Sequence, residues 1–229
     1  DKNYKYKHSI FWNLGNIFLN SLLWPFKFLF LKFKFRIKYV GKEKIRKFKK
    51  TGYFIYVNHT QPFADTFIPS VPIFPKRNYF IVNPENVSMK FLGNFVGLMG
   101  AIPIPTNRDG MENFLDCIKS TIKKNNSITI YPEAHIWPYY TKIRPFKTVS
   151  FKYPIQLEKP VFCMTNTYQK RGRKKDKIKM VTYIDGPFYQ NRSLSPQDQK
   201  KELRDIVYNC MVERSQKSNI DKIRYIKNE

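Results

Sequence analysis

Short apolar runs, separated by segments long enough to form a helix, limit the folds that this chain can adopt. Continuous apolar runs of this length are typical of strands buried on both faces of a sheet. Helical spacing of apolar residues follows the acidic Asp109 over 109–124, and a closing helix is expected over 196–214. The alternation predicts an α/β fold with a single domain, in which a mixed, mostly parallel sheet is flanked by helices. The expected strands are 53–57, 79–82, 128–131, 160–164 and 178–184, with a basic loop at 170–175 and a turn at 185–187.

The segment 10–31 is strongly apolar but is interrupted by Asn, Ser, Pro25 and Lys27. Trp12 and Trp24 lie where interfacial anchors of a membrane helix would lie. Because Pro25 disfavours one continuous helix, the pattern predicts two short helices that lie in or dip into one membrane leaflet. We therefore expect a membrane-association segment at 1–31, followed by a domain at 32–229. The alternative is a pair of helices that pack on the protein's own core.

The charge of the chain is strongly positive, with 42 Lys plus Arg against 17 Asp plus Glu and a net charge of +25. Residues 1–50 alone carry fourteen of the basic residues and two acidic ones. Such a balance indicates a polyanionic partner: a phosphorylated substrate, an anionic lipid surface or a nucleic acid. Basic and apolar residues alternate over 32–40, which predicts a half-buried strand whose basic face meets lipid headgroups or stays solvated at a sheet edge.

The cysteines give no sign of a disulfide framework or a zinc site, because there are three of them at wide spacings: Cys117, Cys163 and Cys210. A reducing cytoplasmic environment is expected. We assign no metal and no cofactor.

His59 is the histidine placed most like a catalyst, because it directly follows the apolar run 53–57. Asp65 lies six positions on and can reach back if the chain turns near Pro62. A carboxylate that fixes the imidazole tautomer would let His59 deprotonate an alcohol. A histidine near one aspartate is also found in purely structural roles, so the pair alone leaves both interpretations open.

Four ordered blocks of sequence resemble the glycerolipid acyltransferase family typified by the bacterial lysophosphatidic acid acyltransferases. The first block is Asn58-His59 with Asp65, and the second is Gly100-Ala101-Ile102-Pro103-Ile104-Pro105. The third is Ile130-Tyr131-Pro132-Glu133-Ala134, followed by Pro145-Phe146-Lys147, and the fourth is Lys159-Pro160-Val161-Phe162. The resemblance covers about 53–165, and the order of the blocks is more specific than any one of them.

Three departures from the family pattern occur in this sequence. Five residues separate His59 from Asp65 where the family has four, which calls for a local bulge near Gln61. The arginine that ends the second block falls on Thr106, with Arg108 two positions beyond. The glycine and arginine of the third block are replaced after Glu133, so that Arg144 or Lys147 is expected to substitute.

The resemblance implies that His59 takes the proton of the acceptor hydroxyl as it attacks an acyl thioester, while Asp65 holds the ring. Glu133 would orient the acceptor or nearby basic side chains. The implied substrate-binding residues are Glu133, Arg108, Lys147, Arg144 and Asn58. His135 is an alternative donor near the site, although scaffolding is the expectation we place first.

The implied reaction moves a fatty acyl group from an acyl carrier protein or coenzyme A thioester to a lysophospholipid. The simplest acceptor is 1-acyl-sn-glycerol 3-phosphate, which would give phosphatidic acid at the cytoplasmic side of the cell membrane. The protein would be peripheral or monotopic there, bound to an anionic membrane surface.

Three alternatives remain at this stage. The same chemistry could act on glycerol 3-phosphate or another lipid alcohol. A basic nucleic-acid-binding protein would explain the charge, but no recognised nucleic-acid motif occurs, so we expect no nucleic acid partner. A catalytically inactive peripheral membrane protein would keep the N-terminal segment without a working pair.

Overall fold

A seven-stranded sheet forms the centre of the protein in the computed structural model, which describes residues 9–87, 93–172 and 178–226. The strand order is β1-β7-β6-β2-β5-β3-β4, and every neighbouring pair is parallel except β6 and β7. This confirms the predicted mixed, mostly parallel α/β architecture. The strands are β1 (Lys38–Val40), β2 (Tyr53–Val57), β3 (Asn78–Val82), β4 (Ala101–Pro103), β5 (Ser127–Ile130), β6 (Val161–Lys170) and β7 (Ile178–Phe188).

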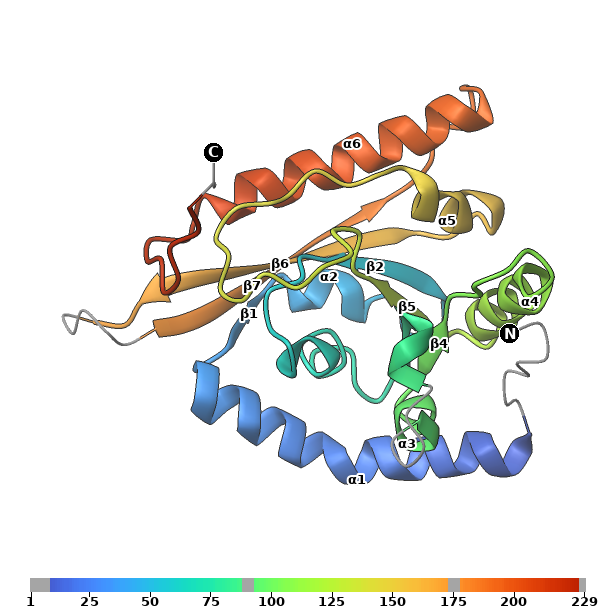
Figure 1. The fold of residues 1–229 in the computed structure, drawn as a ribbon, viewed down its shortest axis with the longest axis horizontal. Coiled ribbons are helices and arrows are strands. Elements are labelled where there is room, and N and C mark those ends of the chain that lie inside the picture. The colour runs from blue at the N-terminus through green and yellow to red at the C-terminus, as the bar shows by residue number, and fades with distance from the viewer. Residues whose placement is uncertain (1–8, 88–92, 173–177, 227–229) are drawn as a thin grey trace.

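Helices cover both faces of the sheet (Figure 1). Apolar residues of α4, α5 and α6 pack on one face, and those of α1, α2 and the segment 64–73 pack on the other. The helices are α1 (Ile10–Phe35), α2 (Lys42–Arg46), α3 (Gly93–Leu98), α4 (Met111–Lys123), α5 (Lys152–Gln156) and α6 (Pro196–Ser215), with 3-10 turns at Ala64–Thr66, Pro84–Val87 and Val149–Phe151.

The central strands match the sequence expectation because they are buried on both faces. All five residues of β2 are buried, as are all four of β5. The predicted helix at 109–124 is α4, which begins after Gly110 rather than from a cap at Asp109. The predicted closing helix is α6, whose cap Ser195 accepts a hydrogen bond from the backbone of Asp198.

The turn predicted at 185–187 is wrong, because these residues continue β7. Gly186 has a φ of 113°, and a side chain there would meet the carbonyl oxygen of Val161 at 2.8 Å. The glycine therefore permits a close approach of two strands at an irregularity in the β6–β7 register, and does not reverse the chain. Of the basic loop predicted at 170–175, residues 173–175 lie outside the described residues, and β6 extends to Lys170.

The prediction of two short N-terminal helices is also wrong, since α1 is one helix of 26 residues that contains Pro25. Aromatic packing on both sides of Pro25 keeps the helix continuous. The ring of Trp24 stacks on that of Phe74 with centroids 4.9 Å apart, and the ring of Phe30 meets that of Phe67 edge-on with centroids 5.9 Å apart. The helix ends at Arg36, which has a φ of 48°. The first four residues of the strand predicted at 32–40 are therefore helical, and only Lys38–Val40 pairs with β7.

The outer face of α1 exposes a continuous apolar stripe. Its members recur every three or four residues and are more than two-fifths exposed: Phe11, Leu14, Phe18, Leu22, Phe26, Leu29 and Phe33. By length and composition, α1 is the one helix of the described ranges that could cross a membrane. An apolar stripe of this extent on a surface marks a site of contact with a membrane or another protein.

Candidate active site

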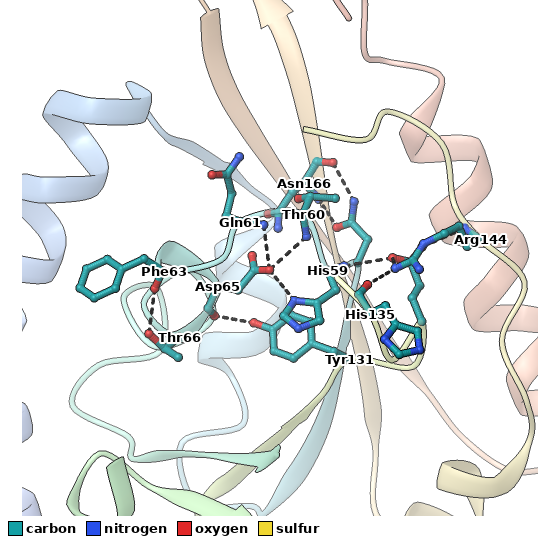
Figure 2. Close-up of polar contacts among 12 residues, drawn as sticks. His59, Thr60, Gln61, Phe63, Asp65, Thr66, Tyr131, His135, Arg144 and Asn166 are labelled. Atoms are coloured by element: carbon teal, nitrogen blue, oxygen red, sulfur yellow. Dashed lines mark hydrogen bonds and ion pairs between the residues drawn. The ribbon is translucent and has the colours of Figure 1, made fainter. Parts of the chain in front are cut away.

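His59 and Asp65 meet at the carboxyl end of β2 (Figure 2). The Nδ1 atom of His59 lies 2.6 Å from Oδ2 of Asp65. The Asp65 side chain is 2% exposed and the His59 side chain is 17% exposed, so the imidazole remains accessible while its partner does not. A carboxylate at Nδ1 favours the tautomer with a free lone pair on Nε2, which is the form that accepts a proton.

The extra residue between His59 and Asp65 is accommodated by a tight turn. The backbone N–H of Asp65 donates to the carbonyl of Gln61 at 3.1 Å. The backbone N–H groups of Thr60 and Gln61 in turn donate to Oδ2 of Asp65, at 3.0 and 2.9 Å. The turn therefore brings the carboxylate back to the ring, as the predicted bulge near Gln61 required.

Two opposing effects act on the ionisation of Asp65. Burial raises the pKa of Asp65 above its ordinary value, and the hydrogen bonds from His59, Gln61 and Thr60 oppose that rise. All three bonds converge on Oδ2, and Oδ1 is buried without a hydrogen-bond partner among the described residues. The donors therefore stabilise a carboxylate that its apolar surroundings disfavour.

Tyr131, just beyond the end of β5, holds the imidazole from one side. Its ring stacks on that of His59 at a centroid distance of 4.2 Å, and its hydroxyl donates to the backbone carbonyl of Asp65. Burial raises the pKa of the Tyr131 phenol, so the hydroxyl stays a donor. Sequence reasoning gave Tyr131 no role of its own, because its contacts with Asp65 span 66 residues of chain.

Glu133 anchors the loop that carries His59. Its Oε2 accepts a hydrogen bond from the backbone N–H of His59 at 3.1 Å and one from the Arg144 guanidinium at 3.1 Å, and its Oε1 accepts the backbone N–H of Arg144 at 2.9 Å. The two side chains are 1% and 13% exposed. Arg144 also donates to the carbonyl of His135 and lies over the Trp137 ring at 4.9 Å. Glu133 therefore pairs with the Arg144 side chain and binds the backbone of His59.

A second set of contacts fixes the loop against β6. The amide of Asn58 donates to the carbonyl of Asn166 at 3.1 Å and accepts its N–H at 2.8 Å. The Gln61 amide donates to the Tyr168 hydroxyl at 2.8 Å, which also contacts the Thr60 hydroxyl at 2.8 Å. Asn58, the neighbour of His59 in the sequence, thus has both ends of its amide engaged with the backbone of β6.

The remaining predicted residues lie at the surface. Arg108 and Lys147 are exposed, and neither side chain forms an ion pair or hydrogen bond within the described ranges. His135 is exposed as well, and its carbonyl rather than its ring contacts Arg144.

Away from this site, Cys163, Asp185 and Cys210 bring their ligand atoms within 4.8 Å of one another. The Asp185 carboxylate is already paired with Arg214 at 2.8 Å and with Lys44 at 2.8 Å. Two cations beside the carboxylate disfavour a metal ion there, so we assign none.

The family model that describes acyltransferases matches residues 36–167, more than half of the chain. The chain belongs to the acyltransferase family. The match includes the His59–Asp65 pair and the Glu133–Arg144 loop, and it confirms the family resemblance inferred from the four blocks. Membership implies an acyl donor and a lipid acceptor.

The fold of this acyltransferase resembles the crystal structure of the 1-acyl-sn-glycerophosphate (LPA) acyltransferase, PlsC, from Thermotoga maritima. The TM-score is 0.55 at 16% sequence identity, and the match covers 95% of this chain and 98% of that one. No curated protein sequence matches the chain significantly.

Proposed function

We propose that this acyltransferase moves a fatty acyl group from a thioester to the free hydroxyl of a lysophospholipid, with 1-acyl-sn-glycerol 3-phosphate as acceptor and phosphatidic acid as product. The observation that carries the proposal is the 2.6 Å contact between His59 Nδ1 and Asp65 Oδ2, which leaves Nε2 available on an accessible ring. The similarity in fold to a lysophosphatidic acid acyltransferase supports this choice of acceptor.

In the proposed reaction the acceptor hydroxyl gives its proton to Nε2 of His59 while its oxygen attacks the thioester carbonyl carbon. The carbon–sulfur bond then breaks, and the thiolate leaves with the proton from the imidazolium. Asp65 stabilises the imidazolium between these steps, as a buried carboxylate does in other His–Asp pairs. The acyl group passes directly to the acceptor.

Arg108 and Lys147 are the proposed partners of the acceptor phosphate, because both are exposed and have no carboxylate partner in the described parts of the chain. Charge-assisted hydrogen bonds from such groups suit a phosphate. Arg144 is held by Glu133, so its contribution to the phosphate site would be electrostatic. Glycerol 3-phosphate or another lipid alcohol is the alternative acceptor, because the third block lacks the family's arginine.

The proposed location is the cytoplasmic side of the cell membrane, with α1 lying along the surface. The exposed apolar stripe of α1 supports this, together with the excess of basic residues within 1–50, because a Lys or Arg side chain that reaches an anionic membrane surface adds about 1 kcal/mol of attraction. A membrane-bound enzyme would receive a lipid acceptor from the bilayer and a soluble thioester from the cytoplasm.

The acceptor is tested by supplying the purified protein with palmitoyl-coenzyme A or palmitoyl-acyl carrier protein and one acceptor at a time. The panel contains lysophosphatidic acid, glycerol 3-phosphate, lysophosphatidylcholine and a long-chain alcohol, with products identified by mass spectrometry. We expect phosphatidic acid to form fastest. Faster acylation of any other acceptor would assign the enzyme to that substrate, and no acylation of any acceptor would refute the proposed function.

Membrane binding is tested by flotation with vesicles that contain phosphatidylglycerol. Replacing Phe11, Phe18 and Leu22 with Asn should abolish flotation, because these side chains are 82%, 69% and 62% exposed on the stripe. Val149→Asn is the matched control, since Val149 is 61% exposed away from α1. Equal flotation of the triple variant and the control would contradict the assignment.

A further inference from the structure

A cavity of about 380 Å³ opens at the edge of the sheet opposite to His59. Its walls include Tyr53 and Asn78, the first residues of β2 and β3, and Asn126, which precedes β5. His59 follows the other end of β2, and a parallel strand of five residues separates the two ends by about 16 Å. The cavity is therefore distinct from the site at which the acceptor hydroxyl would react.

Basic side chains dominate the polar part of this cavity. Six of them line it, and no Asp or Glu does so among the described residues: Lys27, Arg46, Lys49, Lys76, Arg77 and Lys124. They come from α1, from α2 and the turn after it, from the segment before β3, and from the residue that follows α4. Basic side chains from four parts of the chain thus line the same cavity.

Lys27 is buried and Lys76 is half-buried, and neither forms an ion pair among the described residues. Lys27 is 2% exposed, and its Nζ donates to the Asn20 amide oxygen at 2.8 Å. Lys76 donates to the carbonyls of Thr51, at 3.0 Å, and Asn125. Burial lowers the pKa of Lys27 to about 8 and that of Lys76 to about 8. Withdrawing a cation from water is costly unless an anion compensates for it.

Two residues that line the cavity, Asn78 and Arg77, also have donor atoms without a hydrogen-bond partner among the described residues. Asn78 is 8% exposed, and its Nδ2 has no hydrogen-bond partner among the described residues. Its Oδ1, by contrast, accepts bonds from Ser127 and Thr129 at 2.8 and 3.0 Å. The Nε of Arg77 is likewise buried and unpaired within the described ranges. Both unpaired atoms are donors, and buried donors are rarely left unsatisfied in native proteins.

We propose that this cavity binds the phosphate group of a second ligand, separate from the acceptor at His59. A phosphate offers three acceptor oxygens and up to two negative charges, which suit a cavity lined by six basic side chains. Trp24 and Phe74, which stack on each other at 4.9 Å, provide an apolar wall for the organic part that carries the phosphate. The volume lies within the range of small-molecule sites. The proposal does not depend on the acyl-transfer proposal.

Calorimetric titration of the purified full chain at 150 mM salt tests the proposal with three probes. Inorganic phosphate supplies the bare group, adenosine 3′,5′-bisphosphate supplies a soluble phosphoester, and dihexanoyl phosphatidic acid supplies a lipid headgroup. We expect saturable binding of at least one probe, and the probe that binds most tightly identifies the source. Replacing Lys27 by Met together with Lys76→Gln should weaken its binding at least tenfold.

Two controls separate this site from general attraction to a basic protein and from the catalytic site. Lys201→Gln removes an exposed positive charge on α6, and His59→Ala alters the catalytic loop; both should bind within twofold of wild type. Because Lys27 is buried and Lys76 is half-buried, Arg46→Gln with Lys49→Gln provides a second test at exposed positions, and it should also weaken binding about tenfold. Absence of saturable binding to all three probes, unchanged affinity in both cavity variants, or an equal loss in Lys201→Gln would each overturn the proposal.

Discussion

Glu133→Gln tests how the ion pair with Arg144 holds the loop that carries His59. The substitution keeps the size of the side chain but removes its charge, and the new amide nitrogen faces donors at His59 and Arg144. Breaking one partner of a buried pair costs about 3–5 kcal/mol. Arg144 is 13% exposed and keeps its contacts with His135 and Trp137. We therefore expect the free energy of unfolding to fall by about 3 kcal/mol, near the lower end of that range.

The change in the free energy of unfolding is measured by urea unfolding followed by circular dichroism. In a chain of this size, a decrease of about 3 kcal/mol corresponds to a fall in Tm of about 6–12 °C. Glu158→Gln is the matched control, because its pair with Arg192 is 61% and 71% exposed. A pair of that kind contributes about 0–1 kcal/mol.

Activity provides a second readout of the same variant. Since Glu133 binds the backbone N–H of His59, its loss should lower kcat of the acyl transfer in conditions where the variant is still folded. Replacing both partners, Glu133→Gln with Arg144→Met, should restore part of the stability but not kcat, because the anchor of His59 remains weakened. Equal stability of Glu133→Gln and Glu158→Gln would refute the assigned role of the ion pair.

Three further substitutions test other parts of the structure by urea unfolding. Ala134→Gly should stabilise the protein by about 0.5–1 kcal/mol, because Ala134 has a φ of 65° that glycine adopts without strain. Tyr168→Phe should cost about 2 kcal/mol, because it leaves the buried amide of Gln61 without its acceptor. Burial alone would raise the pKa of Asp185, but the hydrogen bonds from Arg214 and Lys44 have the larger effect and lower this pKa below its ordinary value. The stability that this carboxylate provides is thus present above about pH 4 and lost as the pH falls through the lowered pKa; Asp185→Asn should cost about 2 kcal/mol at pH 7 and progressively less in acid.

The parts of the fold that were predictable from the sequence depend on local patterns. The strands β2 and β5 are continuous apolar runs because both of their faces are buried, and α4 repeats its apolar residues at helical spacing. The pair His59 and Asp65 was recognisable because six positions along one loop separate them, and its family blocks follow in order.

Features that depend on contacts between distant segments could not be predicted in this way. The rings of Trp24 and Phe30 hold α1 continuous through Pro25 by packing on the segment 67–74, so the local signal of the proline was misleading. The loop that carries His59 also depends on contacts between distant segments. Tyr131 and Tyr168 join it through contacts that span 66 and 107 residues, and no spacing rule in the sequence marks them.

The cavity at the opposite sheet edge could not be predicted from the sequence either. Its six basic residues come from four separate segments, and in a chain with 42 Lys and Arg none of them is distinctive by sequence. Only the burial of Lys27, at 2% exposure, sets that side chain apart from a solvated lysine. Side chains of this type are almost never fully buried unless they are paired.

The central claim is that His59 acts as the base in acyl transfer, and the kcat of His59→Ala with a saturating acyl thioester and lysophosphatidic acid tests it most directly. His135→Ala is the matched control, because His135 is exposed on a neighbouring loop and its ring makes none of the contacts that hold His59. We predict that kcat falls by a factor of about 10² to 10⁴ in His59→Ala and changes by less than about threefold in His135→Ala, both variants keeping the wild-type circular dichroism spectrum. A folded His59→Ala variant with the kcat of the wild type would contradict the mechanism.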